Sequence, residues 1–399
     1  MVFLLYYQYA VLFALGLMLL NLVINFFVYK NVENYSLPEQ ILKNPPLISI
    51  LIPARNEAEN ISRCLKSLLK QDYQNLEIIV LNDNSTDATG KVVKGFAQKD
   101  SRVRLVEGAP LEDGWTGKNF AAHQLAKYAK GEYFIFTDAD TVHFPKSISS
   151  AFGALITTKI DALSIYPRQL MVSFWERMSV PIINIALQCF IPFILIKKSK
   201  SPLFSTAIGQ FMLFKREAYE KAGGYESIKG HLVDDIQMSK RVKKSGYKFM
   251  VFDGKNTIFC RMYKNLEGVV IGLTKSIYPA FGNILALFSF TGLLSASLLF
   301  PFILLPLGAF LFDWPAAIIR LIIIQIIIIL VIKTMLAIRY KQKMLDILLA
   351  PVSMAVIDAL IFVSFFQAKY GEGLSWKGRV YDVSKSDKTR LVREGHRVN

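Results

Sequence analysis

Long apolar runs near both ends of the chain flank a middle segment of mixed character. Residues 1–29 contain no charged side chain, and residues 276–312 form a second uncharged stretch. Residues 318–338 and 345–366 are further apolar runs. Each run reaches roughly the 20 residues that a membrane helix needs. The pattern predicts an N-terminal transmembrane anchor over 1–30, a C-terminal region of about three hydrophobic segments over 276–366, and a basic tail over 367–399.

The middle segment, 31–275, alternates between two periodicities. Continuous apolar runs occur at Leu47–Pro53, Glu77–Leu81 and Tyr133–Phe136, and helical spacing follows the first two. Short β-branched runs separated by helices are typical of strands buried on both faces of a parallel α/β sheet. Ligands of such sheets bind beyond the carboxyl ends of the strands.

Polar side chains follow each predicted strand at that edge. Residues 53–57 (PARNE), 82–87 (NDNSTD) and 137–140 (TDAD) come directly after the three runs. Asp138 and Asp140 are two apart, so on an extended strand end both carboxylates would point the same way. This suits a hard divalent cation held through oxygen ligands to a phosphate. An isolated DxD is also a common surface pattern, and its position after a buried strand favours the functional interpretation.

A second acidic pair, Asp234 and Asp235, opens a predicted helix that runs to Lys244. Plain N-capping explains such a pair taken alone, because free amides at a helix start favour negative charge. Together with the DxD, the pair supplies the two acidic functions of metal-assisted group transfer, one to hold a metal on the leaving phosphate and one to take a proton from the acceptor.

Charge and composition exclude several classes of protein. The 399 residues carry a formal charge of +16 and are 53% hydrophobic, which is too apolar for a disordered or nucleic-acid-binding tail. Three dispersed cysteines form neither a disulfide framework nor zinc spacing. A channel or transporter would place polar residues in the apolar runs, whereas here they gather in the middle segment.

Basic residues beside the apolar runs predict the orientation. Lys30 follows the anchor, and Arg339, Lys341 and Lys343 follow the third run, so the positive-inside rule puts the middle segment in the cytoplasm. Counting four single spans would put the basic tail outside. A re-entrant fourth segment, broken near Pro351, would remove the conflict. The alternative is an external tail.

Residues 170–196 are a further apolar stretch inside the middle segment. Val180–Ile196 ends at Lys197 and Lys198, which is marginal for a span but suits an interfacial helix. A single crossing there would put Asp138 and Asp235 on opposite sides of the bilayer. We therefore expect an interfacial helix.

The ordered strings IPARNE, LNDNSTD, GWTGKNFA, TDAD, GQFMLFKREAYEKAGGY and HLVDD resemble the family-two, GT-A fold nucleotide-sugar glycosyltransferases over about residues 45–265. The resemblance implies a GT-A domain inserted between N- and C-terminal transmembrane helices. It assigns Pro53, Arg55, Glu57 and Lys118 to the nucleotide-sugar pocket and Asp83 to the uracil ring. It also assigns Asp138 to the ribose and metal, Asp140 to Mg²⁺ or Mn²⁺, and Asp235 to the general base of an inverting transfer.

Some assignments stay open. Asp234, His231, Arg261 and Lys275 are candidates for the acceptor or phosphate side. His231 is either a metal ligand, an acceptor contact or an ordinary loop histidine; Arg261 and Lys275 are either counter-charges to a diphosphate or a structural arginine and a membrane-surface lysine. Lys118 is alternatively a solvated loop lysine.

The closer resemblance is to membrane members that glycosylate lipids, of the carotenoid (diaponeurosporenoate), hopanoid or ceramide type. It is carried by 261–263 (RMY), 272–275 (GLTK) and 376–381 (WKGRVY), the last of which raises the hypothesis that the tail folds back over the active site. It implies transfer of a single sugar, with UDP-glucose as the expected donor, to a lipid at a bacterial cell membrane, with no nucleic-acid partner. The alternatives are a processive polysaccharide synthase, whose QxxRW string is absent here, and a polyprenyl-phosphate glycosyl synthase.

Overall fold

The protein, described from a computed structural model over residues 1–281, 283–382 and 390–394, divides into two compact units. The helical unit comprises Met1–Val28, Met171–Pro192 and Tyr263–Gln367. The sheet unit comprises Tyr29–Leu170, Phe193–Met262 and Ala368–Asn399. This division differs from the predicted boundaries, because most of 170–196 groups with the helices and the basic tail groups with the sheet.

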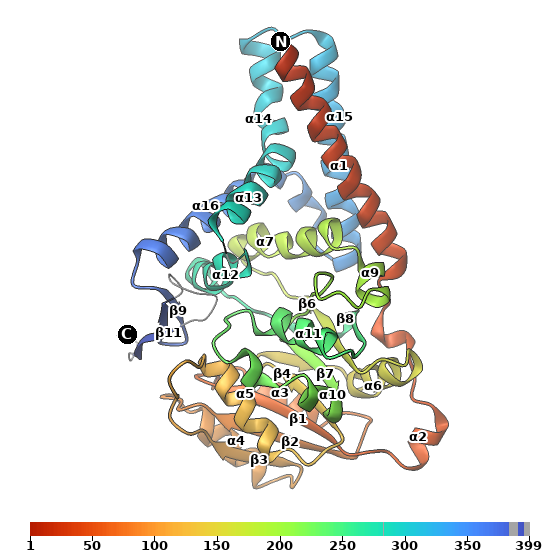
Figure 1. The fold of residues 1–399 in the computed structure, drawn as a ribbon, viewed down its shortest axis with the longest axis vertical. Helices are drawn as coiled ribbons and strands as arrows, with labels where there is room; N and C mark the ends of the chain where they lie inside the picture. Colours follow the sequence, from red (N-terminus) through yellow and green to blue (C-terminus); the bar gives the residue numbers. More distant parts are fainter. Residues whose placement is uncertain (282, 383–389, 395–399) are drawn as a thin grey trace. The chain divides into compact units, whose positions relative to one another are not determined.

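The sheet unit is built on a mixed sheet with the order β3-β2-β1-β4-β7-β6-β8-β5 in the described chain (Figure 1). The strands are β1 (Ile48–Ala54), β2 (Leu76–Asn82), β3 (Val103–Glu107), β4 (Tyr133–Thr137), β5 (Thr141–His143), β6 (Ala162–Gln169), β7 (Phe211–Lys215) and β8 (Phe249–Cys260).

The expectation of a parallel sheet is correct for only part of this sheet. Strands β3, β2, β1 and β4 are parallel, whereas β7 runs antiparallel to both β4 and β6, and β5 antiparallel to β8. A short apolar run predicts a buried strand but carries no information about its direction, which depends on how the chain returns to the sheet.

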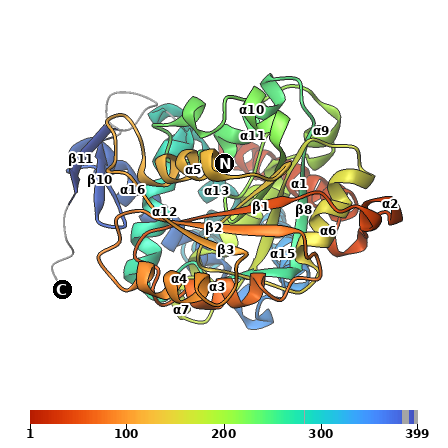
Figure 2. The same ribbon diagram turned by 90° about the horizontal axis from the view of Figure 1, so that it is seen from below.

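Helices cover both faces of the sheet (Figure 2). On one side lie α3 (Ile61–Leu68) and α4 (Thr89–Ala97), and on the other α5 (Gly117–Tyr128) and α10 (Arg216–Lys221). Alternate residues of β1, such as Ile48 and Ile50, join Leu65 in the main core, which α6 (Ser147–Thr157) also enters. On the opposite face, Phe136 of β4 packs against Tyr219 of α10. Both faces are therefore buried, as the continuous apolar strands require.

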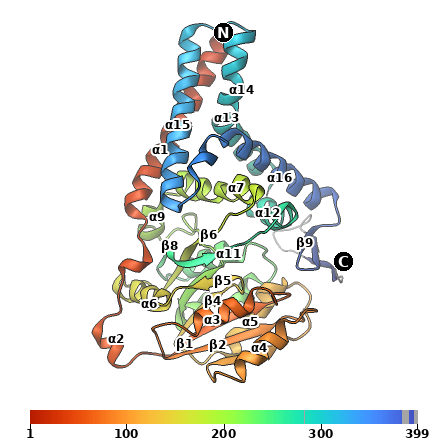
Figure 3. The ribbon, with the colours of Figure 1, turned by 180° about the vertical axis from the view of Figure 1, so that it is seen from behind.

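The helical unit contains three helices that are long and apolar enough to cross a membrane among the residues described. These are α1 (Val2–Val28), α15 (Ala316–Tyr340) and α16 (Ala350–Tyr370). Figures 1 and 3 show α1 beside α15, where the buried Gln325 side chain donates to Gln8 Oε1 at 2.7 Å. Shorter helices of the same unit include α12 (Leu266–Phe281), α13 (Ile284–Leu298) and α14 (Phe300–Pro306).

Two predicted segments, the re-entrant fourth run and the interfacial helix, have a different structure from the one expected. The fourth apolar run starts in a short 3-10 helix, η5 (Met344–Ile347), and after a turn α16 begins at Ala350 and continues to Tyr370. Proline in the first helical turn costs no intrahelical hydrogen bond, so it marks the start of the helix here. The predicted interfacial helix over 170–196 is instead a series of short pieces: α7 (Phe174–Ser179), α8 (Pro181–Ile185), a π-helical segment η2 (Ala186–Phe190) and α9 (Phe193–Lys198).

The C-terminal part of the sheet unit forms a small antiparallel sheet. Its strands are β9 (Leu374–Trp376), β10 (Arg379–Asp382) and β11 (Arg390–Glu394). Trp376 pairs with Arg379, so β9 and β10 form a hairpin with a two-residue turn.

Candidate active site

The loops after β1 and β2 are tied to each other at the predicted edge of the sheet. Arg55 Nη1 donates to the carbonyl oxygens of Asp83 at 2.8 Å and Asn84 at 3.0 Å. Asn56 and Asn84 both have left-handed backbone, with φ of 52° and 50°. Asparagine tolerates this conformation better than most residues, which explains the amide at both turns. The loops thus bring Arg55, Glu57 and Asp83 into one region.

The two aspartates of the DxD lie in the turn between β4 and β5. Asp138 Oδ1 pairs with Lys118 Nζ at 2.9 Å. Asp140 instead has a hydrogen-bonded thiol partner in Cys260, and its buried Oδ1 has no hydrogen-bond partner. The expectation that an extended strand continues through Asp140 is wrong, because β4 ends at Thr137 and a turn follows, in which each carboxylate has its own partner.

Burial, together with the nearby charges of Asp138 and Glu57, raises the pKa of Asp140 to about 7. The same surroundings hold the pKa of the Cys260 thiol well above its ordinary value. This end of the site therefore carries more acidic groups than its surroundings neutralise, which is the electrostatic condition for binding a cation.

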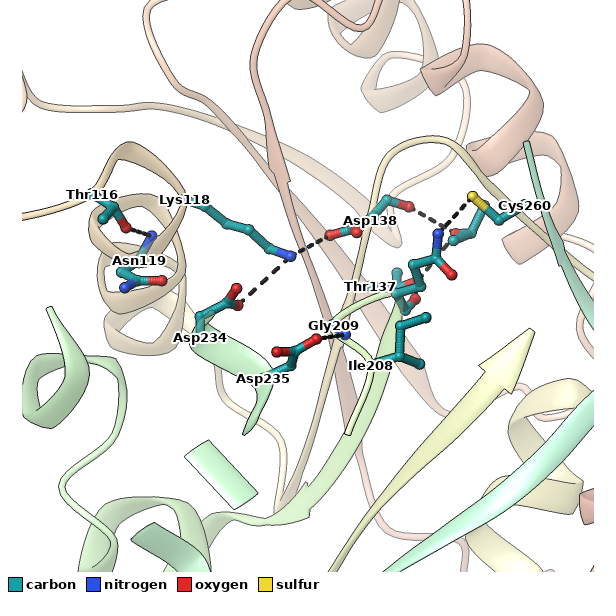
Figure 4. A network of polar contacts seen from close by, with 12 residues as sticks. Thr116, Lys118, Asn119, Thr137, Asp138, Ile208, Gly209, Asp234, Asp235 and Cys260 are labelled. Atoms are coloured by element: carbon teal, nitrogen blue, oxygen red, sulfur yellow. Dashed lines mark hydrogen bonds and ion pairs between the residues drawn. The ribbon is translucent and has the colours of Figure 1, made fainter. Parts of the chain in front are cut away.

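Lys118 lies between the two acidic pairs (Figure 4). It stands in the first turn of α5, whose N-cap Thr116 accepts from the Asn119 amide. Its Nζ is 2.9 Å from Asp138 Oδ1 and 3.7 Å from Asp234 Oδ2. Burial alone would lower the pKa of Lys118, but the two carboxylates outweigh it and hold that pKa well above its usual value. The solvated-lysine alternative is excluded by these contacts.

Asp234 and Asp235 open α11 (Asp234–Lys244), as expected. Asp235 Oδ2 accepts from the Gly209 amide at 3.0 Å and Oδ1 from the Ile236 amide at 2.7 Å. Burial raises the pKa of Asp235 to about 7; Asp234 raises it too, while Lys118 and the two amides oppose the shift. A carboxylate with such a pKa can accept a proton near neutral pH.

Two positions that sequence reasoning left without a role shape this region. A Cβ added to Gly209 would lie 2.8 Å from Lys118 Nζ, so the ammonium would have to shift from its present position. Asn119 is fully buried, and its amide donates to the carbonyl oxygens of Ile228, Lys229 and His231. Asn119 thereby fixes the loop that leads into α11. Both residues belong to the quoted strings GQF and GKNFA, but only the fold shows these contacts.

The remaining candidate residues lie on several separate elements. His231 lies in the loop before α11, Arg261 follows β8, and Lys275 stands on α12 in the helical unit. Pro53 lies in β1, paired in register with Leu81. Within the described part of the chain, no three His, Cys, Asp or Glu side chains form a ready metal cluster, so His231 is not assembled with the DxD into one. His143 is buried beside Thr141, and burial lowers its pKa to about 3.

The mixed, curled sheet with acidic groups at one edge has a solved counterpart. The mannosyltransferase PcManGT from Pyrobaculum calidifontis, solved with GDP-Man and Mn²⁺, superposes with a TM-score of 0.54 at 17% identity, covering 92% of this chain and 100% of that one. This likeness establishes the fold as GT-A.

Sequence comparison finds similarity to one family. Residues 49–223 match the model of glycosyl transferase family 2. The 4,4'-diaponeurosporenoate glycosyltransferases of Staphylococcus haemolyticus and Staphylococcus aureus are 25% identical over 233 residues and 27% identical over 256 residues. These matches cover 58% and 60% of this chain, and 60% and 63% of those relatives. Residues 49–223 are thus similar to the family-two glycosyltransferases, and the chain spans about three fifths of the length of the curated relatives it matches.

Proposed function

We propose that the protein is an inverting, metal-dependent enzyme that transfers one sugar from a UDP-sugar, with UDP-glucose as the expected donor, to a membrane lipid. The observation that carries this proposal is the meeting of the two acidic pairs at Lys118. Asp138 and Asp234 come from loops nearly a hundred residues apart in the chain, yet the same ammonium contacts both. This shared contact supports a donor site and an acceptor-side base within one domain.

Asp138 and Asp140 are the residues that would hold Mg²⁺ or Mn²⁺. The buried, unpartnered Oδ1 of Asp140 and the carboxylate of Asp138 are hard oxygen donors of the kind that these ions prefer. Two carboxylates are sufficient when phosphate oxygens and water complete the coordination. A bound divalent cation would offset the charge that develops on the diphosphate leaving group. Lys118 adds a fixed positive charge beside it.

Asp235 would act as the base. An acceptor hydroxyl attacks the anomeric carbon, the bond from that carbon to the diphosphate oxygen breaks, and the hydroxyl proton passes to a carboxylate oxygen of Asp235. Hydrogen bonds from the Gly209 and Ile236 amides fix the orientation of this carboxylate. Direct displacement inverts the anomeric configuration, so an α-linked donor gives a β-glycoside. No covalent intermediate with the protein is needed.

The proposed accepting group is a hydroxyl or a carboxylate of the lipid: the assigned base Asp235 supports a hydroxyl, and the diaponeurosporenoate in the relatives' name supports a carboxylate. A carboxylate acceptor is ionised before it reacts and needs little help from a base, whereas a hydroxyl acceptor depends strongly on Asp235. Three helices able to span a membrane agree with an apolar acceptor and with a multi-pass membrane protein. The basic residues that follow α1 and α15 support a cytoplasmic catalytic domain in a bacterial cell membrane.

The decisive experiment measures UDP release by the purified protein with Mn²⁺ or Mg²⁺, a panel of UDP-sugars and total membrane lipid. We expect lipid-dependent release from one donor, loss in Asp140→Ala and Asp235→Asn, and normal release in the control Glu220→Gln, whose side chain is exposed in an ion pair with Arg216. Loss of UDP release in Asp140→Ala but not in Asp235→Asn would indicate an acidic acceptor. Release from no donor, with GDP-sugars and polyprenyl-phosphate acceptors also inactive, would overturn the proposal.

A further inference from the structure

The C-terminal hairpin places basic side chains on the predicted nucleotide site. Lys377 and Gly378 form its two-residue turn with φ of 50° and 80°. Positive φ at both central residues matches the twist of the strands, so the hairpin is tight and its tip is well defined. Both the tip and the loops after β1 and β2 belong to the sheet unit.

Arg379, directly after this turn, forms a forked ion pair with Asp83. Its Nη1 is 2.5 Å from Asp83 Oδ2 and its Nη2 is 2.9 Å from Oδ1. The two side chains are only 2% and 7% exposed. Two parallel N–H···O bonds of this kind fix a carboxylate in direction as well as position. Asp83 is the residue expected to read the uracil ring, so its orientation bears directly on donor binding.

The same arginine requires a glycine at the start of α5. A Cβ at Gly117 would lie 1.9 Å from Arg379 Nη1 and 3.1 Å from Asp83 Oδ2. The Gly117 amide also donates to the Tyr381 hydroxyl of the hairpin at 3.0 Å. Gly117 immediately precedes Lys118, so the hairpin holds the end of the helix that carries the ammonium.

Two further contacts join the hairpin tip to the loop after β1. Lys377 Nζ pairs with Glu57 Oε1 at 2.7 Å, and the Lys377 carbonyl accepts from Arg55 Nε at 3.0 Å. Three of the residues expected around the nucleotide, Arg55, Glu57 and Asp83, therefore contact the hairpin.

We infer that Arg379 is a positioning residue of the donor site, which acts by orienting Asp83 and, with Tyr381, the N-terminus of α5. This inference rests on the proposed nucleotide-sugar donor. Removing one partner of a buried ion pair leaves the other charge uncompensated, so Asp83 would reorient when Arg379 is lost. Lysine cannot replace arginine here, because it lacks the planar fork that holds both carboxylate oxygens.

The test measures the dissociation constant of UDP with Mn²⁺ by calorimetry on the full-length protein, together with donor KM and kcat. We expect about 10-fold or more weaker UDP binding in Arg379→Ala and in Arg379→Lys, with a raised donor KM and a smaller change in kcat at saturating donor, because a supporting contact acts mainly on the bound geometry. Ser375→Ala, an exposed position on the same hairpin, is the matched control.

A second variant separates this role from general instability. Gly117→Ala keeps every charge but displaces the guanidinium, so we expect it to weaken UDP binding as well, and the double variant Gly117→Ala/Arg379→Ala to bind no worse than Arg379→Ala alone. Normal UDP binding by Arg379→Ala would overturn the inference while leaving the proposed function intact. Fully additive losses in the double variant would also overturn it. A wild-type protein that binds no UDP would instead overturn the proposed donor and this inference together.

Discussion

At the scale of single residues, the site depends on one ammonium among carboxylates. Lys118 contacts Asp138 directly and approaches Asp234, and its charge opposes the burial that raises the pKa of Asp235. The protonation of the base is therefore linked to Lys118 and Asp234.

The first prediction concerns pH. Asp235 must be ionised to accept a proton, and its pKa in the fold is about 7, so its active form is lost as pH falls through that value. For a hydroxyl acceptor we expect kcat to fall about tenfold for each pH unit below the pKa of Asp235. A pH–rate profile measured from 5.5 to 8.5 with saturating donor and metal checks this. A flat profile with a hydroxyl acceptor would contradict the assignment of Asp235 as base.

The second prediction concerns Lys118→Met. Loss of the ammonium removes a charge that lowers the pKa of Asp235, so the acidic limb should move to higher pH. Activity at pH 7 should fall about tenfold or more, because a fixed positive charge beside the diphosphate is also lost. Comparison of the two pH–rate profiles measures both effects. An unshifted limb would show that Lys118 and Asp235 are not electrostatically coupled.

At the scale of elements, α5 connects the parts of the site. Its first turn carries Lys118, and its buried Asn119 holds the loop 228–231 that leads into α11. The position of Asp234 and Asp235 therefore depends on a side chain whose amide donates to the loop before them.

The third prediction is that Asn119→Ala lowers both stability and turnover. Three carbonyl oxygens lose a donor, and a buried unsatisfied polar group costs about 1–3 kcal/mol. We expect a lower Tm in detergent and a lower kcat, with UDP affinity close to wild type, because the donor-side residues keep their contacts. Differential scanning fluorimetry and calorimetry provide the two readouts. Unchanged kcat would show that the loop holds its position without Asn119.

At the scale of the whole molecule, one chain combines a domain of GT-A fold with helices that can span a membrane. The domain's charged groups lie in the sheet unit, whereas α1 and α15 present long apolar surfaces, including the 70% exposed Phe13. Apolar surface of this extent is typical of lipid contact, because soluble domains rarely leave such surface in water.

The fourth prediction tests the side of the membrane on which the catalytic domain lies. The native cysteines Cys64, Cys189 and Cys260 are all buried, so an introduced cysteine at the exposed Ser101 would give a clear labelling signal. We expect Ser101→Cys to react with an impermeant maleimide only after the cells are permeabilised. Labelling of intact cells would place the domain outside and contradict the proposed orientation.

Much of the fold and of the site chemistry follows from local sequence pattern. The periodicity and length of the apolar runs predicted the strands β1, β2 and β4, the helix α1 and the apolar C-terminal region. Burial in a sheet or a bilayer requires continuous hydrophobic side chains. The acidic residues after β4 and at the start of α11 were identifiable in the same way, since both follow from the position of element ends along the chain.

Only the tertiary structure decided which distant groups meet. The reversal of β7, the turn that separates Asp138 from Asp140 and the pairing of Lys118 with two carboxylates depend on how the chain returns to the sheet. The contact between Arg379 and Asp83 joins residues 296 positions apart. Sequence periodicity reports which side chains are buried but not what they are buried against, because long-range partners are selected by the packing of the complete fold.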